Sequence, residues 1–157
     1  MLSEEVKTRI TQLKDRYPHA KSALLPALHL AQGEHNGWLS DEVMAEVAEA
    51  MGLPPAEVRS VASFYTMFHR QPVGKHLVQV CTNLSCSLLG AGHIVEHVKR
   101  KLGIEVGETT ADGQFTLLEV ECLGSCGTAP MMQINDTYYE NLTVERVDEI
   151  LNQLAKE

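Results

Sequence analysis

The four cysteines of this 157-residue chain fall into two close pairs. Four residues separate Cys81 from Cys86, and three separate Cys122 from Cys126. A gap of 35 residues lies between the pairs, and no cysteine is left over. Four soft thiolate donors in two short loops are typical of an all-cysteine metal site. The chain is therefore expected to adopt a fold that brings these two loops together.

Three kinds of chemistry fit this cysteine pattern. A binuclear iron–sulfur cluster takes four thiolates, two per iron, from loops whose backbone N–H groups hydrogen-bond to sulfur. Glycine allows the close backbone approach that such loops need, and four glycines lie in or near them: Gly90, Gly92, Gly124 and Gly127. A structural zinc ion is the alternative, although zinc sites most often space paired cysteines by about two residues. Disulfides or unrelated buried cysteines would need an oxidising compartment, which nothing in the sequence indicates.

Length and composition predict a folded protein of the cytosol. With 157 residues and 44 % hydrophobic content, the chain can bury a core as one domain or as two small ones. Residues 1–7 lack a basic stretch followed by an apolar run, and Pro26 and His29 interrupt the longest apolar segment, residues 23–31. We therefore expect no signal peptide, no membrane insertion and a reducing compartment.

The formal net charge of −8 is concentrated in the half of the chain that carries the cysteines. Residues 75–157 contain twelve acidic residues against six Lys and Arg, whereas residues 1–74 contain nine against seven. An acidic surface repels phosphate backbones and anionic lipid. We expect protein partners and no nucleic acid.

Residues 1–72 are predicted to form a helical N-terminal bundle. The first helix is expected over residues 3–17 with Ser3 as its N-cap. The second is expected over residues 21–32, where Pro26 is tolerated only in the first turn or at a kink.

The third helix of this bundle has the clearest limits. Ser40 is its expected N-cap, Leu39 can pack on Met44, and Gly52 stands where a C-terminal cap belongs. A fourth helix is predicted from Pro55 towards Phe68. The segment 70–74 that follows is the only plausible linker in the chain, and it sets the predicted domains at 1–72 and 73–157.

Residues 73–157 are predicted to form an α/β sandwich. Strands are expected at 76–81 and 115–122, and each delivers the first cysteine of a pair at its carboxyl end. A helix over 87–102 lies between them. This strand–helix–strand order implies a crossover that lays the two strands parallel and brings both cysteine loops to one edge of the sheet.

The remaining elements of this domain are a hairpin and a closing helix. The hairpin is expected over residues 131–140, and the helix begins after Thr143. The helix over 87–102 should turn six apolar residues inward: Leu88, Ala91, Ile94, Val95, Val98 and Leu102.

Two short motifs in this region match enzyme signatures only superficially. His93, Glu96 and His97 match the H-x-x-E-H pattern of inverted zinc peptidases, but they fall on the polar side of the predicted helix. We expect a solvated helix face there and assign no catalytic residue. The segment 90–92 lacks the third glycine of a dinucleotide fingerprint, so we expect this chain to bind no dinucleotide itself.

Longer motifs resemble a known family. Residues 80–86, Val-Cys-Thr-Asn-Leu-Ser-Cys, and 121–130, Glu-Cys-Leu-Gly-Ser-Cys-Gly-Thr-Ala-Pro, resemble the thioredoxin-like [2Fe-2S] ferredoxins. These are the 24 kDa-type (E) subunits of bacterial NADH:quinone oxidoreductase, respiratory complex I. The likeness covers nearly the whole chain, because residues 23–32, 37–40 and 63–68 also resemble that family's helical N-terminal region.

This resemblance implies a thioredoxin-like fold for the second domain and one [2Fe-2S] cluster bound by all four cysteines: Cys81, Cys86, Cys122 and Cys126. Pro130 would occupy the place of the fold's cis-proline. Because the bound cluster is a dianion and reduction adds a further negative charge, we expect a low reduction potential. The acidic residues expected beside the cluster are Glu119, Glu121 and Asp136.

The resemblance also implies a partner and a place in the cell. The partner is an iron–sulfur subunit that binds FMN and NADH and exchanges single electrons with this chain, which is expected to catalyse nothing in isolation. The complex, an NADH dehydrogenase, would hold the chain in the cytoplasm at the periphery of the inner membrane. Soluble NAD-linked hydrogenases and formate dehydrogenases use similar subunits and stay open as alternatives. A structural four-cysteine zinc module for protein interaction is the alternative of a different class.

Overall fold

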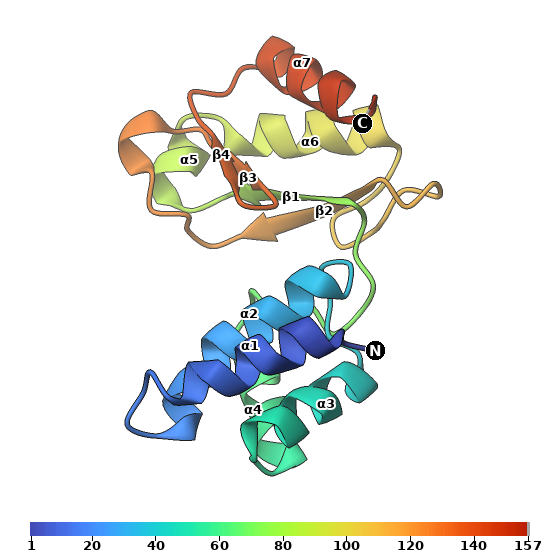
Figure 1. The fold of residues 1–157 in the computed structure, drawn as a ribbon. Helices are drawn as coiled ribbons and strands as arrows, with labels where there is room; N and C mark the ends of the chain where they lie inside the picture. The colour runs from blue at the N-terminus through green and yellow to red at the C-terminus, as the bar shows by residue number, and fades with distance from the viewer. Residues whose placement is uncertain (157) are drawn as a thin grey trace. The chain divides into compact units, whose positions relative to one another are not determined.

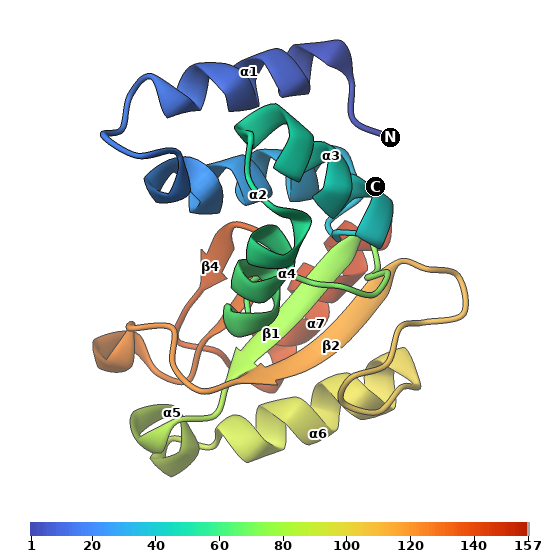
Figure 2. The same ribbon diagram turned by 90° about the horizontal axis from the view of Figure 1, so that it is seen from below.

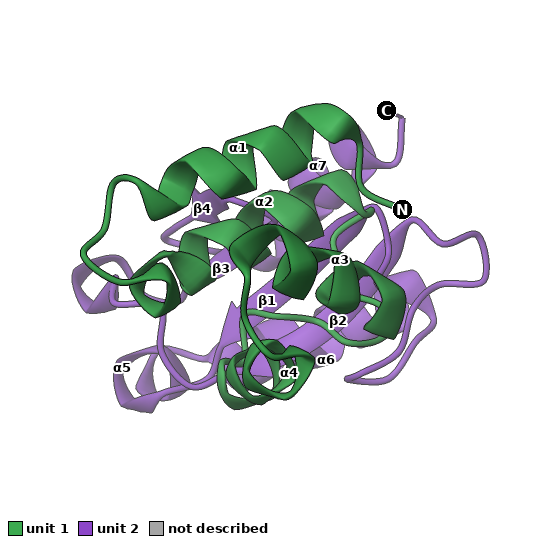
Figure 3. Ribbon diagram, turned by 60° about the horizontal axis from the view of Figure 1, so that its bottom comes forward, with its two compact units in different colours: residues 1–72 green, residues 73–157 purple. Residues whose placement is uncertain are grey.

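The computed structural model describes residues 1–156 and divides into two compact units, Met1–Pro72 and a second that starts at Val73 (Figure 3). Each unit has its own apolar core. Within the described residues, no helix has the length and apolar character needed to cross a membrane.

The first unit is built from helices. Its elements are α1 (Glu4–Lys14), the 3₁₀ helix η1 (Ala20–Ala23), α2 (Leu24–Glu34), α3 (Asp41–Met51) and α4 (Pro55–Phe64) (Figure 1). Helix α3 packs against α1, α2 and α4. The fully buried side chains at the centre are Ile10, Leu28, Leu39, Val43, Val47, Met51 and Val58.

The predicted caps of this unit are confirmed. The Oγ atom of Ser3 accepts a hydrogen bond from the backbone N–H of Val6 at 3.2 Å, and Ser40 caps α3 through the N–H of Val43, also at 3.2 Å. Gly52 ends α3 in the left-handed conformation with φ of 66°. Pro26 lies in the first turn of α2, where its missing N–H leaves no intrahelical hydrogen bond unmade.

Three helix ends differ from the prediction. Helix α1 stops at Lys14, and α4 stops at Phe64 because Tyr65 is already extended. Helix α2 continues through Gly33 to Glu34, because the left-handed residues that close it are Asn36 and Gly37, and the N–H of Gly37 donates to Gln32 O at 2.9 Å.

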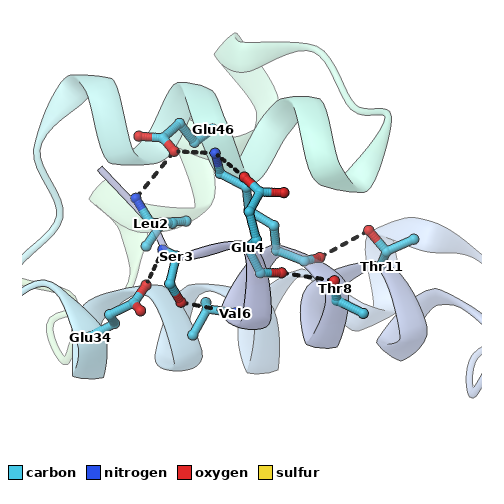
Figure 4. Close-up of polar contacts among 9 residues, drawn as sticks. Leu2, Ser3, Glu4, Val6, Thr8, Thr11, Glu34 and Glu46 are labelled. Atoms are coloured by element: carbon cyan, nitrogen blue, oxygen red, sulfur yellow. Dashed lines mark hydrogen bonds and ion pairs between the residues drawn. The ribbon is translucent and has the colours of Figure 1, made fainter.

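Two carboxylates hold the start of the chain (Figure 4). Glu46 on α3 accepts a hydrogen bond from the backbone N–H of Leu2 at 3.1 Å and pairs with Lys7 Nζ at 3.0 Å. Glu34 on α2 accepts from the N–H of Ser3 at 2.9 Å, and its hydrogen bonds with Ser3 lower the pKa of this carboxyl. These contacts join residues distant in sequence, and no sequence pattern indicated them.

The second unit is an α/β sandwich around a mixed sheet. Its elements are β1 (His76–Cys81), α5 (Leu84–Leu88), α6 (Ala91–Leu102), β2 (Phe115–Val120), the 3₁₀ helix η2 (Cys126–Thr128), β3 (Met132–Ile134), β4 (Thr137–Tyr139) and α7 (Val144–Leu154). The strand order is β2-β1-β3-β4. Strands β1 and β2 are parallel, as predicted, and the other two pairings are antiparallel.

Helices α6 and α7 cover the same face of this sheet (Figure 1). Figure 2 shows β1 and β2 side by side with α7 behind them. The core between helices and strands includes the buried side chains Val78, Val80, Val95, Val98, Leu117, Met132, Val147 and Leu151. This packing fixes the direction of β1 and β2, and thereby the edge at which both strands end.

The predicted helix over 87–102 is wrong in its first turn. Gly90, with φ of 94°, divides it into α5 and α6, since a left-handed residue cannot continue a right-handed helix. Leu88, predicted to face inward, is 78 % exposed on α5, whereas Ala91 and the apolar stripe of α6 are buried as predicted.

A carboxylate joins α6 to α7. Asp148 Oδ1 lies 2.8 Å from His97 Nε2 and 3.0 Å from Lys101 Nζ. His97 is therefore partly covered by α7 rather than solvated as predicted, while His93 and Glu96 are exposed. The hydrogen bond from His97, followed by that from Lys101, holds the pKa of Asp148 below its ordinary 3.8.

An Asp148→Asn variant should be less stable than the wild type at neutral pH. Because the folded-state pKa of Asp148 is depressed, its contribution is complete above the unfolded-state value of 3.8 and is lost as the pH falls through the lower folded-state value. Urea denaturation at a series of pH values should show the difference shrinking below pH 3.8. Glu149→Gln, an exposed carboxylate on the same helix, is the control; an equal effect there would contradict the assignment.

Candidate metal centre

The parallel pairing of β1 and β2 brings the two cysteine loops to one edge of the sheet. Cys81 is the last residue of β1 and pairs in register with Val120, the last residue of β2. The backbone N–H of Thr82 donates to Val120 O at 3.1 Å and extends this alignment by one residue. Cys122 follows two residues later, and Figures 1 and 2 both place α5 and η2 at the same end of the unit.

The four thiols differ in exposure. Cys81 and Cys86 are only 3 % and 2 % exposed, and they pack with Ala91 and Met131. Cys122 and Cys126 are exposed. A group bound by all four sulfur atoms would have one side against buried side chains of the protein and the other side exposed to solvent.

Cys81 lies within hydrogen-bonding reach of two other thiols, those of Cys86 and Cys122. Burial raises the pKa of Cys81, but the backbone N–H groups of Asn83 and Leu123 and the two thiols outweigh burial and leave this pKa below its ordinary value. Cys81 therefore becomes a thiolate more readily than an ordinary cysteine does.

The surroundings of Cys86 include the fourth cysteine, Cys126. Burial raises the pKa of Cys86, and the adjacent Cys81 and the charge of Cys126 raise it further, although the N–H of Met131 opposes them. Mutual repulsion of this kind is expected of thiolates held together without a cation. A bound cation would offset this repulsion, so the donor set fits a positively charged metal group.

The sulfur atoms also have the backbone donors that a cluster requires. The N–H of Gly124 lies 3.4 Å from Cys122 Sγ, the N–H groups of Asn83 and Leu123 face Cys81, and that of Met131 faces Cys86. Such N–H groups stabilise the anionic sulfur of an iron–sulfur cluster. Gly124 adopts φ of 78°, a conformation that glycine reaches without strain.

Four thiolates can bind either a single zinc ion or a binuclear iron–sulfur cluster. A zinc ion holds four thiolates about 2.3 Å from one point. Across residues 1–156, no three His, Cys, Asp or Glu side chains gather tightly enough around one point to hold such an ion.

The bond between Ala129 and Pro130 is cis, which confirms the prediction for Pro130. The next residue, Met131, is fully buried, and its carbonyl accepts a hydrogen bond from the N–H of Cys81 at 3.2 Å. The segment after the second cysteine pair is thereby joined to the strand that carries the first.

One of the three acidic residues expected beside the cysteines lies elsewhere. Glu119 and Glu121 lie at the cysteine end of β2, and Glu121 O is 3.9 Å from Cys81 Sγ. Asp136 lies in the β3–β4 turn beside the start of β1, where the N–H of Asn135 donates to Leu77 O at 3.1 Å. That turn is at the opposite end of the sheet, so the expectation for Asp136 is wrong.

Sequence reasoning missed the residues that hold the second cysteine loop. Tyr138 OH donates to Leu123 O at 2.8 Å, and the N–H of Asn141 donates to Thr128 O at 2.7 Å. The Glu140 carboxylate accepts hydrogen bonds from the hydroxyl groups of this loop. No spacing or motif relates these residues to the cysteines, because the hairpin alone brings them together.

A thioredoxin-like α/β unit that gathers four thiols at the carboxyl ends of two parallel strands defines an iron–sulfur protein of the thioredoxin type. Residues 10–155 match the sequence model of the thioredoxin-like [2Fe-2S] ferredoxin family. The chain belongs to this family.

Two bacterial relatives are similar over most of their length. The chain is 48 % identical to the NADH-quinone oxidoreductase E 2 subunit of Rhizobium meliloti (strain 1021), covering 87 % of this chain and 80 % of the relative. It is 43 % identical to the NADH-quinone oxidoreductase E subunit of Rickettsia conorii, covering 99 % and 90 %.

Two longer proteins match over only part of their length. The chain is 47 % identical to the mitochondrial NADH dehydrogenase [ubiquinone] flavoprotein 2 of Dictyostelium discoideum, covering 97 % of this chain but 62 % of the relative. A crystal structure of an air-oxidized NAD+-reducing [NiFe]-hydrogenase superposes with a TM-score of 0.73 at 26 % identity, covering 85 % of this chain and 23 % of the hydrogenase chain.

Proposed function

We propose that this chain is the [2Fe-2S] electron-transfer subunit of an NADH:quinone oxidoreductase, with Cys81, Cys86, Cys122 and Cys126 as the cluster ligands. The gathering of four thiols at one sheet edge carries the proposal. The names of relatives that are 43 % to 48 % identical to the chain support it.

The four cysteines and the residues around them have different roles in the proposed site. A bound [2Fe-2S] cluster accepts and donates one electron at a time. Cys81 and Cys86 hold its buried side, where Ala91 and Met131 exclude water. The N–H groups that face the sulfur atoms stabilise negative charge there without adding a titratable group. Cys122 and Cys126 leave the other side open to an electron donor or acceptor.

The proposal places FMN and NADH on a partner subunit. This chain lacks a dinucleotide fingerprint, whereas its relatives are named as parts of NADH-oxidising enzymes. Three exposed leucines on and beside α5, Leu84, Leu88 and Leu89, adjoin the cysteine loop, and exposed apolar patches mark protein contacts. The proposed location is the cytoplasmic periphery of the inner membrane, reached through contacts with the complex.

The second candidate is the equivalent subunit of an NAD-linked hydrogenase. The superposition on the hydrogenase chain favours it, but at 26 % identity that similarity is weaker than the similarity to the oxidoreductase subunits. Affinity purification of the chain from its native cells distinguishes them, because the first candidate predicts quinone-reductase subunits among the bound proteins and the second predicts hydrogenase subunits.

Anaerobically purified protein should contain iron and labile sulfide in equal amounts and show the visible absorption of a [2Fe-2S] centre. Metal analysis by mass spectrometry and sulfide determination provide the measurement. Zinc bound in place of iron, without sulfide, would mean that the chain is a structural zinc module and that the electron-transfer role is wrong.

A further inference from the structure

The carboxylate of Glu140 contacts two residues close to Cys126, one before it and one after it. Its Oε1 accepts hydrogen bonds from Ser125 Oγ and from Thr128 Oγ1, the second at 2.5 Å. The two hydroxyl oxygens lie 2.7 Å from each other. Ser125 precedes Cys126 directly and Thr128 follows two residues after it. The carboxylate therefore holds the turn that carries Cys126 by two hydrogen bonds.

The backbone around Glu140 is itself anchored on both sides. Before it, Tyr138 pairs with Gln133 in the β3–β4 ladder, and its hydroxyl group donates to the carbonyl of Leu123. After it, the N–H of Leu142 donates to Pro130 O at 2.9 Å. These bonds fix the main chain on each side of Glu140, and the bond from Tyr138 also joins the hairpin to the cysteine loop.

Glu140 carries a charge that its partners do not neutralise. The hydroxyl groups of Ser125 and Thr128, in that order of effect, hold the pKa of this carboxyl below its ordinary value. The side chain is therefore ionised at neutral pH. Both hydrogen-bond donors are uncharged hydroxyl groups, so the negative charge stays uncompensated beside the loop of Cys122 and Cys126.

We propose that Glu140 is a positioning residue for the cluster: it holds the Cys122–Cys126 loop in the ligating conformation, and its negative charge makes one-electron reduction of the bound cluster less favourable. This inference rests on the proposed function. Reduction adds a negative charge to a group that is already anionic, and a nearby carboxylate opposes that addition. Residues that orient metal ligands by hydrogen bonds typically change metal affinity about 10- to 100-fold when mutated.

Four variants of the whole chain, each purified anaerobically with its cluster, test this role. Glu140→Gln keeps the shape and removes the charge, and Glu140→Ala removes both the charge and the hydrogen bonds. Tyr138→Phe removes one neutral hydrogen bond to the same loop, and Asp136→Asn removes one negative charge at the far end of the sheet. Redox titration gives the potential, and loss of absorbance in excess chelator gives the rate of cluster release.

The potential should shift upward in both Glu140 variants and stay at the wild-type value in Tyr138→Phe and Asp136→Asn. Cluster release should be about 10- to 100-fold faster in Glu140→Ala than in the wild type, with Glu140→Gln between them. If Glu140→Gln folds, as circular dichroism reports, but cannot retain a cluster, the positioning role is supported by that loss.

An unchanged potential in cluster-loaded Glu140→Gln overturns the inference. An upward shift of equal size in Tyr138→Phe overturns it as well, because loosening of the loop would then explain the effect without the charge. A wild-type chain that binds no cluster at all would instead refute the proposed function, so the two failures are distinguishable.

Discussion

A Cys86→Ser variant is expected to lose most of its iron and sulfide. Cys86 is buried beside Cys81, and serine offers a hard, weakly acidic hydroxyl group where iron–sulfur clusters take a thiolate. The loss should appear as low iron and sulfide content and as weak visible absorbance after anaerobic purification. Because the substituted side chain is small and buried, the fold should survive the change, which circular dichroism checks.

The matched control for Cys86→Ser replaces both histidines of α6, His93→Ala with His97→Ala. Both residues lie outside the two cysteine loops, so iron and sulfide should stay at the wild-type content. The control should lose some stability, since His97 no longer reaches Asp148. Full cluster content in Cys86→Ser would show that the ligand assignment is wrong, and cluster loss in the control would show that α6 takes part in binding.

A Leu117→Ala variant is expected to lower the free energy of unfolding of the second unit by about 2–5 kcal/mol, the usual range for a buried leucine. Leu117 is fully buried on β2, in the core that α6 and α7 cover. Truncation removes apolar contacts and leaves a cavity that the close-packed neighbours fill only in part. Urea denaturation, followed by circular dichroism at constant cluster content, measures the change.

The adjacent Leu118→Ala is the control for this cavity effect. Side chains alternate along a strand, so Leu118 points to the opposite face of the sheet, where it is half-buried. Its truncation should destabilise the protein less than that of Leu117. An equal or larger loss at Leu118 would mean that the face covered by α6 and α7 is not the principal core of this unit.

Local sequence signals predicted the elements that depend on neighbouring residues. Ser3, Ser40 and Gly52 cap their helices as expected, because a cap requires only a side chain and the N–H or C=O groups within about one turn of it. The parallel pairing of β1 and β2 was also predictable, since a strand–helix–strand unit permits few topologies.

Local sequence signals gave a wrong helix boundary near Gly90, because a glycine can either loosen a loop or interrupt a helix. Gly90 was expected to give a cysteine loop freedom, and it also interrupts the helix, because its left-handed backbone separates α5 from α6. Leu88 continues the apolar period of α6 in the sequence, but the turn moves it to the surface. A helical pattern cannot show that the chain changes direction inside it.

The sequence by itself determined that this protein has four thiols at two predicted strand ends, and the motifs around them indicated the family. Only the tertiary structure decided which thiols are buried, that Asp136 lies at the far end of the sheet, and that Glu140 holds the second cysteine loop. The physical reason is that thiol chemistry and strand periodicity are properties of the residues and their near neighbours. Burial and hydrogen bonds between distant segments exist only after the β3–β4 hairpin has packed beside β1.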